Sequence, residues 1–188
     1  MRMENKLKNR SGFTLAETLL AVLILLLVST IVATGVPVAQ RAYEKVVVAA
    51  NAQLLLSTTA TALRDELGTA WDVSIIKKTI GSKQTDVVSY FSADTGALSE
   101  LYTDSTGIML KEYNVVDNLN QADAKVLDSR LLVTEEAADK KEGLVATYTG
   151  VGVSGDYIVF SGMSVKKGAT VLASLKDPLK IKVLWAKG

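Results

Sequence analysis

The chain has 188 residues, of which 48% are hydrophobic and 22% charged, and its formal net charge at pH 7 is +1. A chain this close to neutral gives no case for nucleic-acid binding from bulk charge. Because it contains no cysteine and no histidine, disulfides, thiolate and imidazole catalysis and the usual zinc sites are excluded, and only oxygen-ligand metals such as calcium remain open.

The first twelve residues are basic and polar. They contain four basic residues and one acidic residue. Residues 13–39 contain a single charged residue, Glu17, whereas 17 basic and 18 acidic residues nearly balance from residue 40 onward. The excess of positive charge therefore lies in a short N-terminal leader.

An uncharged apolar run of 22 residues follows from Thr18 to Ala39, with the sequence TLLAVLILLLVSTIVATGVPVA. A bilayer core of about 30 Å needs roughly 20 helical residues, and a soluble amphipathic helix would show polar residues every three or four positions. The run therefore predicts a membrane-spanning helix. A removable secretory signal cut near Ala39 is the alternative, although its apolar region is usually only about 7–15 residues long.

Glu17 is an acid at the start of this apolar run. An ionised side chain inside a membrane span costs about 2.5–3.5 kcal/mol on insertion scales, so such a residue is a functional candidate by default. The hexapeptide GFTLAE at residues 12–17, preceded by Lys8, Arg10 and Ser11, resembles the class III signal of type IV pilins and pseudopilins. In that family a glycine is followed by Phe-Thr-Leu-Ile-Glu and a long apolar run. The resemblance covers residues 6–40, and Ala16 stands where the family has a larger aliphatic residue.

The resemblance implies a processing site and an assembly site. A membrane prepilin peptidase would cut between Gly12 and Phe13 and N-methylate Phe13. Glu17 would pair with the N-terminal amine of a neighbouring subunit during filament assembly. Since losing one partner of a buried ion pair costs about 3–5 kcal/mol, this contact would set the axial register. The alternative for Glu17 is a hydrated position in the lipid headgroup zone, without a partner.

The function implied by the resemblance is that of a structural subunit of a type IV pilus or pseudopilus-like filament, and not that of an enzyme. The implied partners are the prepilin peptidase, other copies of the chain or other pilins, an assembly platform protein with its ATPase, and membrane lipid. No cofactor and no nucleic acid are expected. The implied location is the cell membrane, with a single pass and an extracytoplasmic head, and then a cell-surface or periplasm-spanning filament. The choice among adhesion, motility, DNA uptake and secretion stays open, and the alternative is a single-pass membrane-anchored extracellular binding protein that does not polymerise.

Gly35 and Pro37 interrupt the apolar run near its end. Proline removes one helical hydrogen bond and clashes with the carbonyl four residues earlier, here that of Ala33, at a cost of about 3 kcal/mol in a helix interior. A helix break is therefore predicted over residues 33–37, as a kink or a loosened turn. Pilins often carry helix breakers near this place, and the resemblance implies a helix that can unwind there in the filament. A simple kink at the membrane exit is the alternative.

The helical pattern resumes after Pro37 and becomes one-sided. Apolar residues recur at alternating steps of four and three residues, interrupted only by Gln53, and predict one apolar helix face. Gly68 would end this helix as its C-cap. The face would pack on a β-rich head or, alternatively, form a dimeric coiled coil. Its positions are Ala42, Val46, Ala49, Gln53, Leu56, Ala60, Leu63 and Leu67.

The chain from about Thr79 onward contains short β-rich runs separated by turn signals. An antiparallel sheet laid on the helix is the economical fold for such runs. Residues 117–142 are polar and weakly patterned, and we expect a surface excursion with a helical turn there. The predicted strands are Asp86–Ser92, Gly107–Asn114, Leu131–Thr134, Gly143–Thr149, Asp156–Ser161, Ala169–Leu175 and Leu179–Trp185.

These patterns together predict an α+β, pilin-like fold, in which a long N-terminal helix spans the membrane with its first half and packs on an antiparallel β-sheet head with its second. The predicted organisation is a leader at 1–12, a transmembrane and assembly half of the helix at 13–39, an amphipathic half at 40–68 and a β-rich globular head at 69–188.

Three further features of the sequence could carry chemistry. Asp94, Asp104 and Asp156 lie in glycine-containing turns, and turn formation explains them better than calcium binding because none has EF-hand spacing. The sequence RDEL at residues 64–67 fits a solvated helix face. A C-terminal set of lysines fits the wet, aggregation-resistant side of an edge strand better than a nucleic-acid site. This set is Lys166, Lys167, Lys176, Lys180, Lys182 and Lys187.

Overall fold

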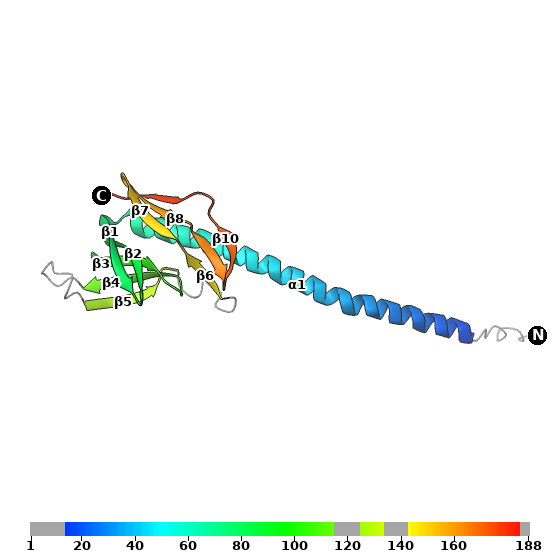
Figure 1. The fold of residues 1–188 in the computed structure, drawn as a ribbon. Helices are drawn as coiled ribbons and strands as arrows, with labels where there is room; N and C mark the ends of the chain where they lie inside the picture. Colours follow the sequence, from blue (N-terminus) through cyan, green and yellow to red (C-terminus); the bar gives the residue numbers. More distant parts are fainter. Residues whose placement is uncertain (1–13, 115–124, 134–142, 185–188) are drawn as a thin grey trace, which may run out of the picture. The chain divides into compact units, whose positions relative to one another are not determined.

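The computed structural model describes residues 14–114, 125–133 and 143–184, and the chain divides into two compact units, Met1–Val46 and Val47–Gly188. One helix, α1 (Leu15–Gly68), runs through the described part of the first unit and continues into the second (Figure 1). The rest of the described chain in the second unit is β-structure and turns. The predicted α+β architecture, with a long helix and an antiparallel sheet, is confirmed.

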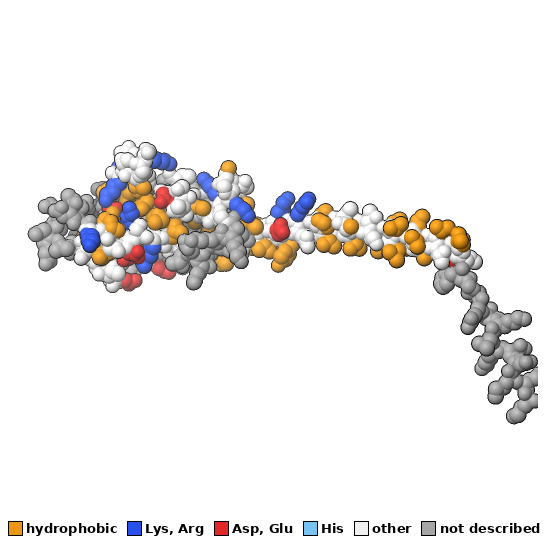
Figure 2. All heavy atoms as spheres, turned by 90° about the horizontal axis from the view of Figure 1, so that it is seen from below, with side chains coloured by type: hydrophobic (Ala, Val, Ile, Leu, Met, Phe, Trp, Pro, Cys, Tyr) orange, Lys and Arg blue, Asp and Glu red, His pale blue; other side chains and the backbone are white. Residues whose placement is uncertain are grey.

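The α1 residues of the first unit are all exposed within the chain. Leucine and alanine, which dominate the start of this segment, have high helix propensity, and an apolar helix of this kind needs no polar face when its surroundings are apolar. Leu15 is 79% exposed and Val38 is 66% exposed. Figure 2 shows hydrophobic side chains along the first part of the helix, in contrast to the mixed surface of the second unit.

The last third of α1 supplies one side of the core of the second unit. Partial burial begins at Val47, and Val48 is the first helix residue packed against the core. Four of the predicted positions are buried, while Ala42, Val46 and Gln53 are exposed, so the prediction of this face was right only in its C-terminal half. The buried helix residues are Ala52, Leu55, Leu56, Thr59, Ala60, Leu63 and Leu67.

Gly68 is the last residue of α1, as predicted, but it does not adopt the left-handed conformation of a glycine C-cap. Instead the amide of Ala70 donates to the carbonyl of Leu67 at 3.3 Å, which satisfies one of the free carbonyls of the last turn. Ala70 is itself fully buried. The chain therefore leaves the helix through a tight turn that is anchored in the core.

The largest sheet is a five-stranded antiparallel meander in which each strand pairs with the next in the chain. Its order is therefore β1-β2-β3-β4-β5. One face carries Val88, Tyr90, Leu101 and Leu110 into the core shared with α1. The strands are β1 (Trp71–Ile80), β2 (Lys83–Phe91), β3 (Leu98–Thr103), β4 (Ile108–Asn114) and β5 (Lys125–Leu131).

Two three-stranded antiparallel sheets complete the described core, with strand orders β10-β9-β6 and β11-β8-β7. Ile158, Phe160, Val165 and Ile181 from these sheets belong to the same hydrophobic cluster as the helix residues. The strands are β6 (Leu144–Thr147), β7 (Gly150–Ser154), β8 (Tyr157–Ser161), β9 (Ser164–Lys167), β10 (Thr170–Ser174) and β11 (Leu179–Lys182).

Several strands differ from the sequence prediction, each for a physical reason. β1 was missed because a register shift between Trp71 and Ser74 interrupts its alternation, and β3 was missed because five successive residues are buried, which also removes alternation. β7 was missed because two of its five residues are glycines, which are typical of turns. β9 was missed because it is only four residues long and ends in two lysines.

The predicted strand Leu131–Thr134 was wrong, since β5 ends at Leu131. The polar stretch 117–142 contains β5, an edge strand whose residues are exposed from Lys125 to Arg130. A strand that is exposed on both faces carries no apolar alternation, so β5 could not be predicted from its residue pattern. The remainder of 117–142, apart from residues 132 and 133, lies outside the described residues.

A partly buried ion pair joins the turn end of the β1–β2 hairpin to β3, the central strand of the sheet. Lys78 of β1 pairs with Glu100 of β3, whose side chain is only 4% exposed. The hydroxyl of Tyr113 on β4 donates to the other Glu100 oxygen at 2.8 Å. In a flat sheet Lys78 and Glu100 would lie two strands and four residues apart, so their contact means that the hairpin curls over this face of the sheet.

Replacing Lys78 by Met should destabilise the second unit by about 3 kcal/mol, because the buried Glu100 carboxylate would then lack its cation. Glu100→Gln should cost less, since Lys78 is 40% exposed and can regain water. Chemical denaturation of the full chain in detergent would measure both. Lys77→Met is the control, because Lys77 is the exposed neighbour on the same strand. Equal, small effects of Lys78→Met and Lys77→Met would contradict this account.

Candidate functional site

The first turn of α1 contains a reciprocal set of hydrogen bonds between Thr14 and Glu17. The backbone amide of Thr14 donates to Glu17 Oε2 at 3.0 Å, and the Thr14 hydroxyl donates to the same oxygen at 3.3 Å. The amide of Glu17 in turn donates to the Thr14 hydroxyl oxygen at 3.3 Å. This is the capping-box arrangement, in which a threonine at the N-cap and a glutamate three residues later satisfy each other's backbone amides.

The capping role of Glu17 was missed by the sequence analysis, although the pattern Thr-x-x-Glu at residues 14–17, directly before an apolar run, is its standard signal. A negative charge in the first helical turn also interacts favourably with the helix macrodipole. Glu17 therefore stabilises the N-terminus of α1, whether or not it also contacts another molecule.

The helix that follows Glu17 is long and apolar enough to cross a membrane, judged by length and composition. Its large side chains are about half exposed or more on every side of the helix, as at Leu23, Ile24 and Leu25, with 59%, 53% and 66% exposure. Within the described residues, the chain supplies nothing that covers them. This surface requires lipid or other apolar helices around it.

Three hydroxyl side chains inside the apolar run are satisfied by their own helix. Ser29 donates to the carbonyl of Leu25 at 2.7 Å, Thr30 to that of Leu26 at 2.8 Å, and Thr34 to that of Thr30 at 3.0 Å. Because these donors are bonded, the polar residues of the run add little cost to immersion in an apolar medium. The segment stays compatible with a membrane despite its hydroxyls.

Gly35 and Pro37 both lie inside α1, which continues through them. A Cβ added at Gly35 would meet nothing within 4 Å, so no close packing in this chain requires glycine there. Pro37 has no amide hydrogen, and the carbonyl of Ala33 therefore lacks its usual helical donor. The predicted weakness at 33–37 stays a prediction. The predicted processing residues, Gly12 and Phe13, lie outside the described residues.

The three turn aspartates of the head are not brought together. Asp104 accepts from the amide of Thr106 at 2.7 Å and from that of Gly107 at 3.2 Å, which is the role of a turn former. Asp156 is exposed in the β7–β8 turn. In the parts of the chain that the structure covers, no group of three or more acidic side chains is placed to hold a metal ion.

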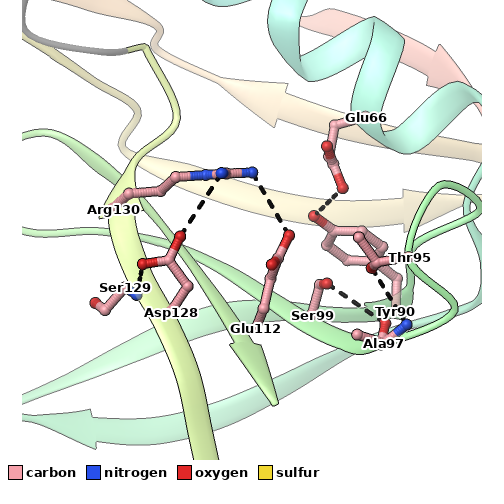
Figure 3. Close-up of polar contacts among 9 residues, drawn as sticks. All are labelled: Glu66, Tyr90, Thr95, Ala97, Ser99, Glu112, Asp128, Ser129 and Arg130. Atoms are coloured by element: carbon pink, nitrogen blue, oxygen red, sulfur yellow. Dashed lines mark hydrogen bonds and ion pairs between the residues drawn. The ribbon is translucent and has the colours of Figure 1, made fainter. Parts of the chain in front are cut away.

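Glu66, predicted to lie on a solvated helix face, is instead half-buried and binds the sheet. The Tyr90 hydroxyl of β2 donates to Glu66 Oε1 at 2.9 Å (Figure 3). Burial, with a further contribution from the Glu66 charge, raises the pKa of Tyr90 well above its ordinary value. This contact ties the end of α1 to the sheet, while Arg64 and Asp65 are exposed as predicted.

A polar hollow of about 340 Å³ lies beside this contact and is lined in part by Asp65, Glu66, Asp94 and Arg130. Arg130 is held by two other carboxylates, that of Glu112 at 3.5 Å and that of Asp128 at 3.6 Å (Figure 3). The positive charge of Arg130 is therefore neutralised by carboxylates of its own sheet. These contacts have the character of structural ion pairs rather than of a nucleophile with its base.

The described lysines of the C-terminal set lie on turns and strands. In β11, Lys180 and Lys182 are exposed and alternate with the buried Leu179 and Ile181, as predicted for the wet face of a strand. β11 is an edge strand of its sheet, where lysine opposes unwanted strand pairing. Lys187 lies outside the described residues.

Residues 7–33 match the family described as the prokaryotic N-terminal methylation motif, which is the prepilin-type signal of type IV pilins. The matched segment contains Thr14 and Glu17 and most of the apolar run. No curated protein and no solved structure matched the chain significantly. The prediction of a prepilin-type N-terminus is confirmed by the family match.

Replacing Pro37 by Ala should strengthen α1 locally, by up to about 3 kcal/mol, because it restores the amide that the Ala33 carbonyl lacks and removes the ring clash. Amide hydrogen exchange of residues 33–41, measured on the full chain in detergent, should become slower. Val38→Ala, at the exposed neighbouring position, should leave the exchange of this segment almost unchanged. Unaltered exchange in Pro37→Ala would show that the helix is not weakened there.

Proposed function

We propose that this chain is a structural, pilin-like subunit that is inserted in the membrane as a prepilin, cleaved after Gly12 and polymerised through its N-terminal helix. The observation that carries the proposal is the acid Glu17 in the first turn of an uncharged helix of membrane-spanning length, inside the prepilin-type signal. The product would be a type IV pilus or a pseudopilus-like filament.

The basic leader favours one orientation in the membrane. Positive residues flanking a span are retained on the cytoplasmic side, and residues 1–12 carry the excess of basic charge. The head would then lie outside the cytoplasm. A membrane prepilin peptidase working at this face would cut between Gly12 and Phe13 and methylate the new amine of Phe13, and the platform protein and ATPase of the system would extract the subunit.

The amine freed at Phe13 and the carboxylate of Glu17 are complementary charges on every copy of the processed chain. In an apolar bundle each is costly alone, and the two are tolerable as a pair. In the filament, Glu17 of one copy would pair with the amine of the next. A subunit at the wrong axial position would leave both buried charges without a partner. The apolar helix surface would supply cohesion, and this ion pair would supply register.

The second unit could serve as a head outside the cytoplasm, because it is stabilised by core packing and needs no disulfides. Its described core combines α1 with three sheets in one hydrophobic cluster, and no cysteine is present. Stability comes from packing, with about 25 cal/mol for each Å² of apolar surface buried. The predicted helix break at Gly35 and Pro37 would allow α1 to adjust between the membrane and the filament.

Two other functions fit parts of the same features. A single-pass anchored binding protein would use the same span without polymerising, and a secreted domain would be released by a cut near Ala39. The mass of the mature N-terminus, taken from native membranes, separates the three. A methylated Phe13 is expected, whereas an intact Met1 supports the plain anchor and Gln40 the secreted domain.

Glu17→Ala should abolish filaments while the cut after Gly12 continues, because it removes the acid needed for the ion pair but not the glycine at the scissile bond. Filaments sheared from cells would be quantified, and the membrane pool would be analysed by mass. Glu44→Ala is the matched control, since Glu44 is an exposed acid on the same helix beyond the apolar run. Normal filament yield from Glu17→Ala would refute the proposed role of this acid.

A further inference from the structure

We propose that the polar hollow at the C-terminal end of α1 binds an aliphatic amine, with its ammonium group held by carboxylates and its hydrocarbon stem lying on leucine side chains. The hollow has a volume of about 340 Å³, and sites for small molecules are concave spaces of about this size or larger. All of its described lining residues belong to the second unit. The proposal therefore does not depend on filament assembly.

The carboxylates around the hollow lack a cation. Asp65, Glu66 and Asp94 line it, and none of the three forms an ion pair with a described residue. Arg130, the cation among the described lining residues, is already paired with two other carboxylates of its sheet (Figure 3). The hollow therefore carries an excess of negative charge, and a positively charged ligand would reduce the repulsion among its acids.

The end of α1 adds to this negative potential. The helix macrodipole places partial negative charge at the C-terminus, where a lysine or arginine of the last turn commonly interacts with the free carbonyls. The last turn of α1 contains no basic residue and carries Asp65 and Glu66 instead. An external cation would supply the favourable charge that the last turn of the helix lacks.

Ser92 is a second and independent indication of a ligand. It lines the hollow although it is only 5% exposed. Its amide donates to the carbonyl of Ala97 and its carbonyl accepts from the amide of Gly96, but its hydroxyl has no hydrogen bond to any described residue. A buried hydroxyl without a partner is unfavourable. Because an ammonium group has three donors, it can bond to this oxygen and to two carboxylates at once.

The lining of the hollow favours an organic cation over a metal ion. Within the described residues, no three acidic side chains are placed around a single ion. Leu110 and Leu132 form an apolar part of the wall. A methylene chain can lie on such a surface while its charged end stays with polar groups, as lysine side chains do. The ligand class is therefore an alkylammonium, supplied either by a free polyamine or by a lysine side chain of a second copy.

Glu66 is the carboxylate on which the affinity should mainly depend. It is half-buried, whereas Asp65 and Asp94 are exposed, so its charge is screened less by water and salt. Its Oε1 accepts from the Tyr90 hydroxyl at 2.9 Å, which fixes the orientation of the carboxylate (Figure 3). Its Oε2 has no partner among the described residues and is available to the ligand.

Spermidine is the probe for this site. Isothermal titration calorimetry of the full chain, in an uncharged detergent at low salt, should show saturable binding that weakens as salt is raised. Glu66→Gln should weaken binding about ten-fold, because it removes a partly buried charge while keeping an oxygen for Tyr90. Ser92→Ala should weaken it about three-fold, through loss of one neutral hydrogen bond. Asp94→Asn, at an exposed position where folding is not at risk, should weaken it about two-fold.

Asp156→Asn is the matched control, because it removes the same charge from an exposed turn residue that does not line the hollow in the described structure. Its affinity for spermidine should equal that of the wild type. Calcium, titrated at the same ionic strength, should bind far more weakly than spermidine. The proposal fails if the wild type shows no saturable binding, if Glu66→Gln and Asp156→Asn bind equally well, or if calcium competes on equal terms.

The two sources of the amine can be told apart by coupling carboxylates to amines with a carbodiimide in native membranes. A crosslink from Glu66 or Asp94 to a lysine of a second copy, identified by mass spectrometry, would identify the neighbouring copy as the source. Spermidine binding without such a crosslink would identify a free amine. Neither result depends on whether the chain forms filaments, so failure of the proposed function and failure of this site are distinguishable.

Discussion

From Leu19 to Val38, α1 presents leucine, isoleucine and valine side chains in every direction, and all of them are exposed within the chain. Removing such surface from water is favourable by about 25 cal/mol per Å², so the surface drives the helix into lipid or against other apolar helices. Dispersion and the hydrophobic effect are not directional, however, and do not specify a register. Glu17, the single charged residue between positions 13 and 39, is the candidate for setting that register.

In the second unit, the same helix is buried on one side only and is held by directional polar contacts. One stripe of α1, from Val48 to Leu67, is covered by strands from three sheets, and the opposite side stays polar or exposed. Directional contacts then fix the arrangement, with Glu66 bonded to Tyr90 at the end of the helix and Glu100 bonded to Lys78 and Tyr113 across the sheet. Burial and the bond to Glu100 also raise the pKa of Tyr113.

The sequence predicted the features that depend on local pattern. The apolar run, the helix end at Gly68 and the buried Leu56, Ala60 and Leu63 follow from composition and period, as does the prepilin-type signal at the N-terminus. Features set by tertiary contact were not predictable in this way. A fully buried strand loses its alternation, a bulged strand shifts it, and Glu66 looked solvated because its partner, Tyr90, lies 24 residues away. The link between Thr14 and Glu17 was local and could have been predicted from spacing alone.

The hydrophobic cluster of the second unit includes helix residues from Ala52 onward, with Val48 packed at its margin. A truncation that removes the membrane segment but is meant to keep the head folded must therefore begin no later than Val47. A chain starting at Trp71 would retain all eleven described strands and still lack the seven buried side chains of α1 and the buried Ala70. The β-structure is in this sense an incomplete domain, which is completed by the continuation of the same helix that carries Glu17.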